Sequence, residues 1–288
     1  MDGKTVLITG ATTGLGRSVA LHLAARGATV LLHGRDQARL DQTAEEVGRR
    51  APAVRTYRAD LADLDQVRAL AQQVLAVEPR LDVLVNNAAA GGGADPEHRE
   101  VSRQGHELRL AVNHLAPHLL TRLLLPLLAP GARVVNVASM GQAPVDLDDL
   151  MMTRDYEGVR AYCRSKLAMI MATFDLAEEV AGLGVTVNAL HPAHLMDTPL
   201  VRQSGLTPEA SVAEGAAPTV RLIADPALAS VTGRYFEQYD DVPAHAQAYD
   251  ATARSRLASA TRSLLAPWAT PIRAALATDA ARRGSAAD

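Results

Sequence analysis

Aromatic residues, cysteine and lysine are all scarce in this chain. Aromatic side chains make up 3% of the 288 residues, which leaves few rings for stacking on nucleobases. The net charge of −3 gives no basic footprint for a nucleic acid, so we expect no nucleic-acid partner. The single cysteine, Cys163, excludes an internal disulfide and fits a reducing compartment. We therefore expect a cytoplasmic protein, with Cys163 as a small packing residue rather than a reactive thiol.

Long hydrophobic runs are also missing. The longest apolar stretch, Leu115–Leu128, is interrupted by Pro117, His118 and Arg122, and it is too short to cross a bilayer. Charged residues near the start, Asp2 and Lys4, do not resemble a signal peptide. The sequence therefore predicts no membrane span.

Strand-like and helix-like segments alternate along the chain. The hydrophobic pattern predicts strands at 4–9, 28–32, 54–59, 81–85, 132–137, 185–190 and 234–236. It predicts helices at 17–26, 36–48, 63–77, 101–128 (bent at Pro117), 155–181 and 208–224. This alternation is typical of an α/β fold of Rossmann type, a doubly wound parallel sheet of about seven strands in a three-layer α/β/α arrangement. We expect one domain over residues 1–266 and a mobile tail over 267–288, unless Trp268 anchors part of it.

A glycine-rich turn joins the first predicted strand to the first predicted helix. It reads Thr9-Gly10-Ala11-Thr12-Thr13-Gly14-Leu15-Gly16. Glycines allow such a turn to bend sharply and to approach a pyrophosphate, whose charge is stabilised by the helix N-terminus. The turn and its flanking elements predict a dinucleotide site, although many strand-to-helix turns are rich in glycine without binding one.

A tyrosine and a lysine are spaced by one helical turn in Tyr162-Cys163-Arg164-Ser165-Lys166. Residues four apart lie on the same face of a helix, so the phenol and the ammonium can converge. A nearby positive charge lowers the pKa of a phenol towards the range of a general acid/base. The spacing alone is common on solvated helices, so its context decides the interpretation.

Taken together, these motifs resemble the short-chain dehydrogenase/reductase family, in its compact single-domain branch. The resemblance covers about residues 4–236 and rests on the glycine turn, Asp60, Asn86-Asn87-Ala88, Asn113, Ser139 and Tyr162-x-x-x-Lys166, in the family's order. It departs from the family at Ala89 and Ala193, where glycines are usual. The tyrosine motif, Gly233-Arg234-Tyr235-Phe236 and a long insert at Met140–Ala161 are closest to the retinol-dehydrogenase-like and carbonyl-reductase-like group.

The resemblance implies a set of catalytic residues. Tyr162 exchanges a proton with the substrate oxygen, and Lys166 lowers the pKa of Tyr162 and binds the nicotinamide ribose. Ser139 donates a hydrogen bond to the substrate carbonyl. Asn113 bends its helix and holds a water linked to Lys166, unless it is only a core amide. No metal is needed, and a zinc site at His191-Pro192-Ala193-His194 is not expected.

A larger set of residues is expected to contact the cofactor. Asp60 receives the adenine amino group, or else caps a helix, and Asn87 and Ala88 border the adenosine, or else form an ordinary polar turn. The full predicted set is Gly10, Thr12, Thr13, Gly14, Leu15, Gly16, Arg35, Asp60, Leu61, Asn87, Ala88, Tyr162, Lys166, Pro192 and Thr198.

The end of the second predicted strand, His33-Gly34-Arg35-Asp36, bears on the choice of cofactor. An NAD enzyme usually has a carboxylate here for the ribose 2′-hydroxyl. In this chain Gly34 takes that place, and Arg35 can pair with a 2′-phosphate, whereas Asp36 reads as a helix cap. The sequence therefore favours NADP(H).

The expected activity is the NADP(H)-dependent reduction of a ketone or aldehyde, or the reverse, on a bulky lipophilic small molecule. Little lysine and much arginine and alanine suggest a GC-rich bacterium, where such reductases often tailor secondary metabolites. The apolar residues Met140, Leu195, Met196 and Leu200 are candidates for the substrate wall. Alternatives are an NAD-dependent alcohol dehydrogenase and a non-catalytic dinucleotide sensor. By resemblance we expect a homodimer or homotetramer, paired through the helices around Asn113 and Tyr162.

Overall fold

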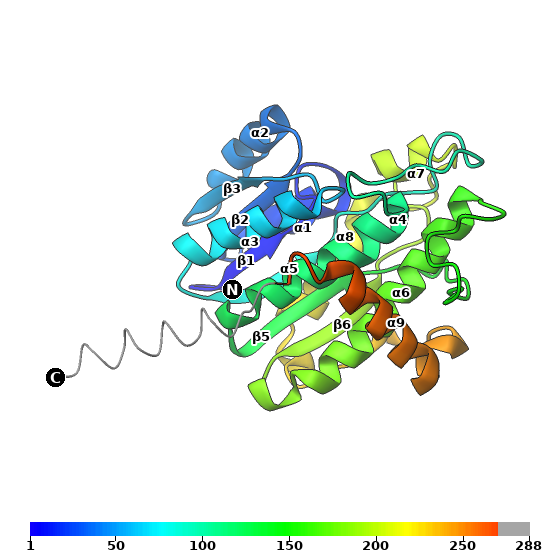
Figure 1. Ribbon diagram of the computed structural model, residues 1–288. Helices are drawn as coiled ribbons and strands as arrows, with labels where there is room; N and C mark the ends of the chain where they lie inside the picture. Colours follow the sequence, from blue (N-terminus) through cyan, green and yellow to red (C-terminus); the bar gives the residue numbers. More distant parts are fainter. Residues whose placement is uncertain (270–288) are drawn as a thin grey trace.

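A single twisted sheet forms the centre of the molecule (Figure 1). The computed structural model describes residues 1–269. The strand order is β3-β2-β1-β4-β5-β6-β7-β8, with β1–β7 parallel and β8 antiparallel to β7. The bounds are β1 Thr5–Ile8, β2 Thr29–Gly34, β3 Val54–Arg58, β4 Leu81–Asn86, β5 Leu128–Val137, β6 Thr186–His191, β7 Tyr235–Glu237 and β8 Asp240–Asp241.

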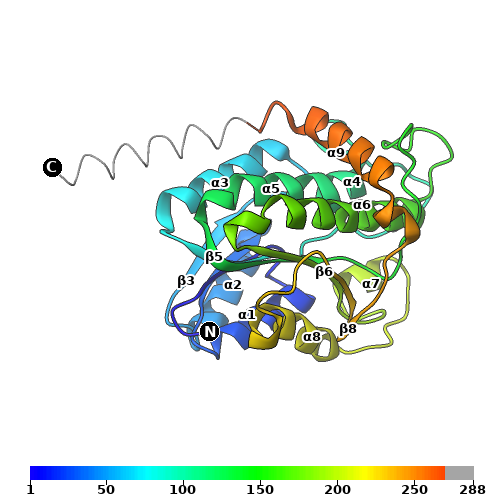
Figure 2. The same ribbon diagram turned by 90° about the horizontal axis from the view of Figure 1, so that it is seen from below.

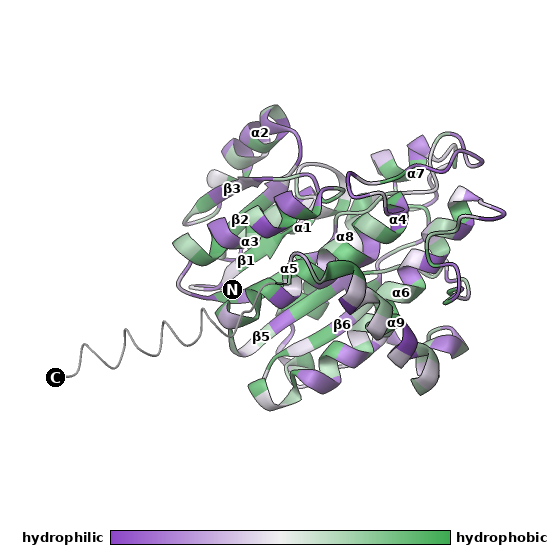
Figure 3. Cartoon of the chain, in the orientation of Figure 1, coloured by the Kyte–Doolittle hydropathy of each residue, from purple (hydrophilic) through white to green (hydrophobic). Residues whose placement is uncertain are grey.

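Helices cover both faces of this sheet, as Figure 2 shows. On one face lie α1 Gly14–Ala24, α2 Gln37–Gly48 and α8 Val212–Ala224, which share a core with the alternate side chains of the central strands. On the other face lie α3 Leu64–Val77, α4 Leu108–Leu110, α5 Ala116–Leu124 and α6 Gly158–Glu179. The central strands carry mainly hydrophobic residues, because both of their faces are covered (Figure 3). The predicted three-layer α/β/α fold is confirmed.

Most predicted elements agree with the structure to within a few residues. Asp36 caps α2 by accepting a hydrogen bond from the Arg39 backbone N–H, as predicted. The short helix α7 (Pro199–Gln203), the strand β8 and the helix α9 (Ala251–Leu265) were not predicted. The predicted tail at 267–288 lies outside the described residues from 270 onward.

The predicted helix over 101–128 is wrong in two respects. Residues 101–107 are not helical, and Val101 instead forms an isolated antiparallel bridge with Glu107. The irregularity lies at the π-helical turn η1 (Ala111–Leu115) and not at Pro117, which sits in the first turn of α5. The π-helical turn and Pro117 are related, because Pro117 has no N–H to donate to the carbonyl of Asn113 four residues earlier.

Helix α9 packs across the outer face of the helical layer and extends the core beyond the third layer (Figure 2). Leu257 and Leu265 of α9 are buried, and Thr261 of the same helix hydrogen-bonds the buried His114 of η1 at 2.8 Å. Trp268 follows α9 and donates from Nε1 to Asp65 on α3 at 2.7 Å, so it anchors the chain beyond residue 266. Within residues 1–269, no helix has the length and apolar character needed to cross a membrane.

Candidate active site

The glycine turn lies between β1 and α1, at the carboxyl edge of the sheet. Gly10 has a φ of +64°, which residues other than glycine rarely adopt. A Cβ on Gly16 would collide with the Gly10 carbonyl oxygen and with the side chain of Asn87. Helix α1 has no side-chain cap at Thr13 and no acidic residue in its first turn, so its first N–H groups are free for a phosphate. These features fit a dinucleotide pyrophosphate.

Asn87 holds the glycine turn against the end of β4. Its Nδ2 donates to the carbonyls of Thr9 at 2.8 Å and Gly10 at 3.1 Å. In return, Thr9 Oγ1 accepts from the backbone N–H groups of Asn87 at 2.9 Å and Ala88 at 3.1 Å. The side chain of Asn87 therefore fixes the backbone of the glycine turn. An ordinary polar turn, the alternative for this segment, would not make these contacts.

His33 supports the same turn from β2, a role that was not predicted from the sequence. Its Nδ1 accepts from the Gly10 backbone N–H at 3.3 Å, and its Nε2 lies 3.1 Å from the Ala59 carbonyl at the end of β3. Burial lowers the pKa of His33 to about 4, so the ring is neutral at neutral pH and Nε2 carries the proton. The sequence feature that could have predicted this role is a histidine near the end of an otherwise apolar strand.

Three residues predicted on the adenosine side lie near the ends of β2 and β3. Arg35 is exposed, and no carboxylate within residues 1–269 lies within 4.0 Å of its guanidinium. Asp60 accepts a hydrogen bond from the Ala62 backbone N–H, while the neighbouring Leu61 is buried. The cap of α3 is Asp63, so Asp60 is not the helix cap weighed above.

Ser139 follows the end of β5 and is 9% exposed. Its Oγ accepts from the Gly141 backbone N–H at 3.0 Å, which leaves the hydroxyl hydrogen available. Its carbonyl lies 3.0 Å from the hydroxyl of Tyr235, a buried residue at the start of β7. Tyr235 thus positions Ser139, a role that was not predicted from its place in the family motif.

Tyr162 and Lys166 project from the first half of α6. The Lys166 Nζ lies 5.7 Å from the centroid of the Tyr162 ring and donates to the Val137 carbonyl on β5 at 2.7 Å. Burial lowers the pKa of Lys166 to about 7. Burial raises the pKa of Tyr162, and an interaction with the Ser139 side chain opposes this rise. The expected lowering of the Tyr162 pKa by Lys166 is therefore wrong, because desolvation dominates.

Asn113 lies within the π-helical turn η1, so the predicted distortion of its helix is present. The amide is buried and fully engaged: it accepts from the Ala90 N–H at 2.8 Å and donates to the Ala90 carbonyl and to Ser165 Oγ, both at 2.9 Å. It thereby links the loop after β4 to the catalytic helix α6. Its contact with Lys166 through a water stays a prediction.

The loop after β6 carries the remaining predicted cofactor residues. Pro192 and Ala193 are buried, and Thr198 caps α7 by accepting from the Val201 N–H at 3.4 Å. A Cβ on Gly14 would lie 2.9 Å from the Thr198 methyl group. The structure therefore brings Thr198 against the glycine turn, as a shared cofactor site requires.

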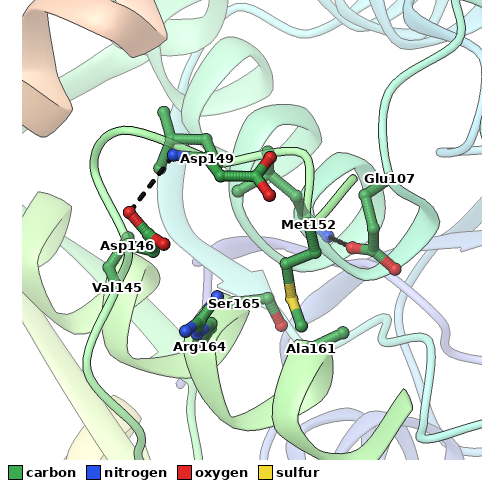
Figure 4. A pocket seen from close by; sticks show the side chains of 10 residues that line it. Glu107, Val145, Asp146, Asp149, Met152, Ala161, Arg164 and Ser165 are labelled. Carbon is green, nitrogen blue, oxygen red and sulfur yellow. Dashed lines mark hydrogen bonds between the residues drawn. The ribbon is translucent and has the colours of Figure 1, made fainter. Parts of the chain in front are cut away.

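A small cavity lined by both polar and apolar side chains lies behind the catalytic helix, between α6 and the insert (Figure 4). Arg164 and Ser165 point into it from α6, and Asp146 and Asp149 face it from the insert. Its volume of about 10 Å³ has room for one water. Arg164 Nε is buried and has no partner within the described chain. The insert therefore packs against the catalytic helix around this cavity.

Comparisons with known proteins agree with this geometry. The short chain dehydrogenase family model matches residues 4–208. The chain is 35% identical to retinol dehydrogenase 13 of Mus musculus, over 89% of this chain and 82% of that protein. It is 37% identical to DnrU of Streptomyces sp. (strain C5), provisionally named a daunorubicin C-13 ketoreductase, over 89% of this chain and 91% of that protein.

Two solved structures show a similar fold. The RhlG/NADP active-site complex of Pseudomonas aeruginosa has a TM-score of 0.68 and 27% identity, over 82% of this chain and 95% of that chain. A 3-ketoacyl-(acyl-carrier-protein) reductase of Brucella melitensis, complexed with NADH, has a TM-score of 0.66 and 27% identity, over 82% and 96%. With a glycine turn, a serine, a tyrosine and a lysine gathered at one sheet edge, the chain belongs to the short-chain dehydrogenase/reductase family, on its retinol-dehydrogenase-like side.

Proposed function

We propose that this protein is an NADP(H)-dependent oxidoreductase that reduces a ketone or aldehyde on a bulky, lipophilic small molecule. The observation that carries the proposal is the convergence of Ser139, Tyr162 and Lys166 at the sheet edge that also carries the glycine turn. Ligands of doubly wound sheets bind at this edge, so cofactor and substrate meet there.

Each side chain has a distinct task in this reaction. Bound NADPH supplies the hydride that reaches the carbonyl carbon. The Ser139 hydroxyl donates to the carbonyl oxygen, and the Tyr162 hydroxyl gives its proton to the developing alkoxide. Lys166 is held beside Tyr162 by the Val137 carbonyl, and its ammonium form stabilises the phenolate that remains.

The preference for NADP(H) rests on the end of β2. Asp36 caps α2 by accepting from the Arg39 N–H, and Gly34 stands where an NAD enzyme usually has its carboxylate. Arg35 is exposed there, and the exposed Arg58 on β3 is the register partner of the preceding residue, Gly34. Two arginines at this point suit a 2′-phosphate. The solved relatives hold NADP or NADH, so the chain's own residues carry this proposal.

The names of two relatives support the proposed substrate class. One relative is a retinol dehydrogenase, and another is provisionally named a ketoreductase of daunorubicin, both names that refer to bulky ring-containing molecules. A tailoring role in bacterial secondary metabolism is therefore part of the proposal, as is a cytoplasmic location suited to a single free cysteine. Pairing into a homodimer or homotetramer stays a prediction, and a dimer formed over η1 and α6 has to accommodate α9.

The test is NADPH oxidation with a panel of bulky ketones, compared between the wild type and Tyr162→Phe. We expect turnover by the wild type and a loss of about 10²–10⁴-fold in the variant, which keeps the ring but lacks the proton donor. NADPH binding should persist in both. Activity that survives the substitution contradicts the proposed mechanism. Binding of NADPH without turnover of any carbonyl would favour the dinucleotide sensor, and faster turnover of alcohols with NAD would favour the dehydrogenase.

A further inference from the structure

A second and larger hollow opens beside the catalytic serine. It has a volume of about 370 Å³, within the range of small-molecule sites. Its wall comes from the residue after Ser139, from the end of β6 and the loop after it, and from the end of β7 and the turn into β8. The lining residues are Met140, His191, His194, Glu237, Gln238, Tyr239 and Asp240. The hollow therefore continues the proposed carbonyl site along the same sheet edge.

Glu237 is a carboxylate without a cation in this hollow. It is partly buried, and its Oε1 lies 3.1 Å from the Tyr235 hydroxyl. No lysine, arginine or histidine within residues 1–269 lies within 4.0 Å of it, whereas Asp241 on the same hairpin pairs with Arg234. The other acidic residue in the lining is the exposed Asp240. A half-desolvated carboxylate in this state attracts a cationic ligand.

His191 is a second polar residue in the wall of the hollow. It is 8% exposed and lines the hollow, yet neither ring nitrogen has a hydrogen-bond partner among the described residues. Burial and the nearby His194 lower the pKa of His191 to about 4, so its ring is neutral at neutral pH. A neutral ring offers one donor and one acceptor. Neither ring nitrogen is fully shielded from solvent, so a ligand group in the hollow can take the place of water on them.

Tyr235 connects this hollow to the reaction centre. Its hydroxyl lies 3.0 Å from the Ser139 carbonyl and 3.1 Å from Glu237 Oε1. A phenol has one hydrogen, so Tyr235 can fully donate to only one of them at a time. The apolar part of the hollow is supplied by Met140, which is 47% exposed, and by Tyr239 at 48%. The Tyr235 hydroxyl therefore links the acidic end of the hollow to Ser139, and the apolar wall lies in the same hollow.

We propose that this hollow holds the non-reacting end of the substrate, and that Glu237 with His191 selects ketones that carry a protonated amine at that end. This inference rests on the proposed carbonyl reduction and narrows its substrate class. An amine donates to the Glu237 carboxylate and to the acceptor nitrogen of His191, while the apolar body lies along Met140. A neutral polar group satisfies His191 alone and leaves Glu237 without its counter-charge.

The test compares two aryl ketones that differ only at the amine, one with a free primary aminoalkyl chain and one with the same chain N-acetylated. We expect wild-type kcat/KM with NADPH to favour the free amine by about tenfold or more, mostly through KM. Glu237→Gln keeps the shape and an acceptor for Tyr235, and it should bring the ratio of the two kcat/KM values close to one. Asp241→Asn is the matched control and should keep the wild-type ratio. Raising the salt concentration should shrink the wild-type preference.

The outcomes separate the two proposals. If the wild type reduces both ketones without preferring the amine, or if Glu237→Gln retains the preference, the selection by Glu237 is wrong and the carbonyl reduction stands. If the acetylated ketone is preferred, the charge assignment of the hollow is reversed and the inference fails. If NADPH reduces neither these ketones nor any of the bulky panel, both proposals fail together.

Discussion

The cofactor half and the substrate half of this molecule are held together in different ways. In the cofactor half, the glycine turn is fixed by short contacts to strand ends, through Asn87, Thr9 and His33. In the substrate half, the insert is fixed by segments about a hundred residues away: Gln247 makes two hydrogen bonds to Val145, and Gln142 accepts from the His245 N–H at 2.8 Å. The first half is a motif built on neighbouring strands, whereas the second depends on the packing of the C-terminal region.

The two kinds of support suit the two kinds of ligand. A turn that binds a cofactor common to many enzymes needs the same backbone path in each of them, and strand ends supply it. Loops that meet a particular substrate need freedom to vary, and the segment 238–250 supplies their support in this chain. We therefore expect substitutions in the two halves to separate cofactor binding from substrate recognition.

The largest effect is expected at Lys166, where the two halves meet. Lys166→Met should reduce turnover by about 10²–10⁴-fold, because the phenolate of Tyr162 loses its counter-charge. The same variant should raise the melting temperature of the cofactor-free protein by several degrees at pH 7. Burial lowers the pKa of Lys166 to about 7. Folding at neutral pH therefore has to bury this charge or release its proton, and either step costs stability that methionine does not.

The difference in stability between the wild type and Lys166→Met should depend on pH. Between pH 7 and about 10.4 the unfolded chain binds one more proton than the folded chain, so wild-type stability rises across that window. The advantage of Lys166→Met should accordingly be greatest at pH 7 and vanish near pH 10.4. Lys4, the other lysine of the chain, pairs with Asp82 at 3.0 Å, and Lys4→Met should give no gain. A melting temperature lowered by Lys166→Met would contradict the account.

The next effect is expected at Arg35, within the cofactor half alone. Arg35→Asp should reverse the ratio of kcat/KM for NADPH and NADH by roughly 100-fold, because a phosphate partner becomes a repelling charge. Arg50, an exposed arginine just after α2, is the control, and Arg50→Asp should leave the ratio unchanged. Steady-state kinetics with both cofactors measure it. A persistent NADPH preference would show that Arg35 is not the selecting residue.

The smallest effect is expected at Gln247, within the substrate half alone. Gln247→Ala removes two hydrogen bonds to Val145, at 2.7 and 2.9 Å, and loosens the insert. We expect KM for bulky ketones to rise a few-fold, in line with about 1 kcal/mol for such bonds, while NADPH affinity stays constant. Fluorescence titration of NADPH alongside kinetics separates the two quantities. A parallel loss of NADPH affinity would show that the halves are not independent.

The sequence predicted the cofactor half better than the substrate half. Strand ends, the glycine turn and the cap at Asp36 follow from local patterns, and all three are present. The helix over 101–128 was overextended because leucine periodicity does not reveal that residues 101–107 pair as a bridge or that Asn113 sits in a π-turn. The direction of the Tyr162 pKa was also missed, since the charge of Lys166 is visible in a sequence and the burial of both groups is not.

Long-range partners were the main omission. Tyr235 is separated from Ser139 by 96 residues, and no local pattern joins them. Helix α9 has weak amphipathic character, so its place across η1 and α6 depends on contacts such as Thr261 with His114. His33 was readable as a polar residue in a buried strand, but its partners Gly10 and Ala59 come from two other elements.

The central claim is that hydride passes from NADPH to a carbonyl carbon in this site while Tyr162 supplies the proton. The most direct measurement uses NADPH deuterated at nicotinamide C4, followed by mass spectrometry of the alcohol formed from a bulky ketone. We predict that one deuterium appears on the carbinol carbon with the wild type and that Tyr162→Phe forms almost no labelled alcohol. An alcohol without deuterium, or undiminished labelling with Tyr162→Phe, would contradict the account.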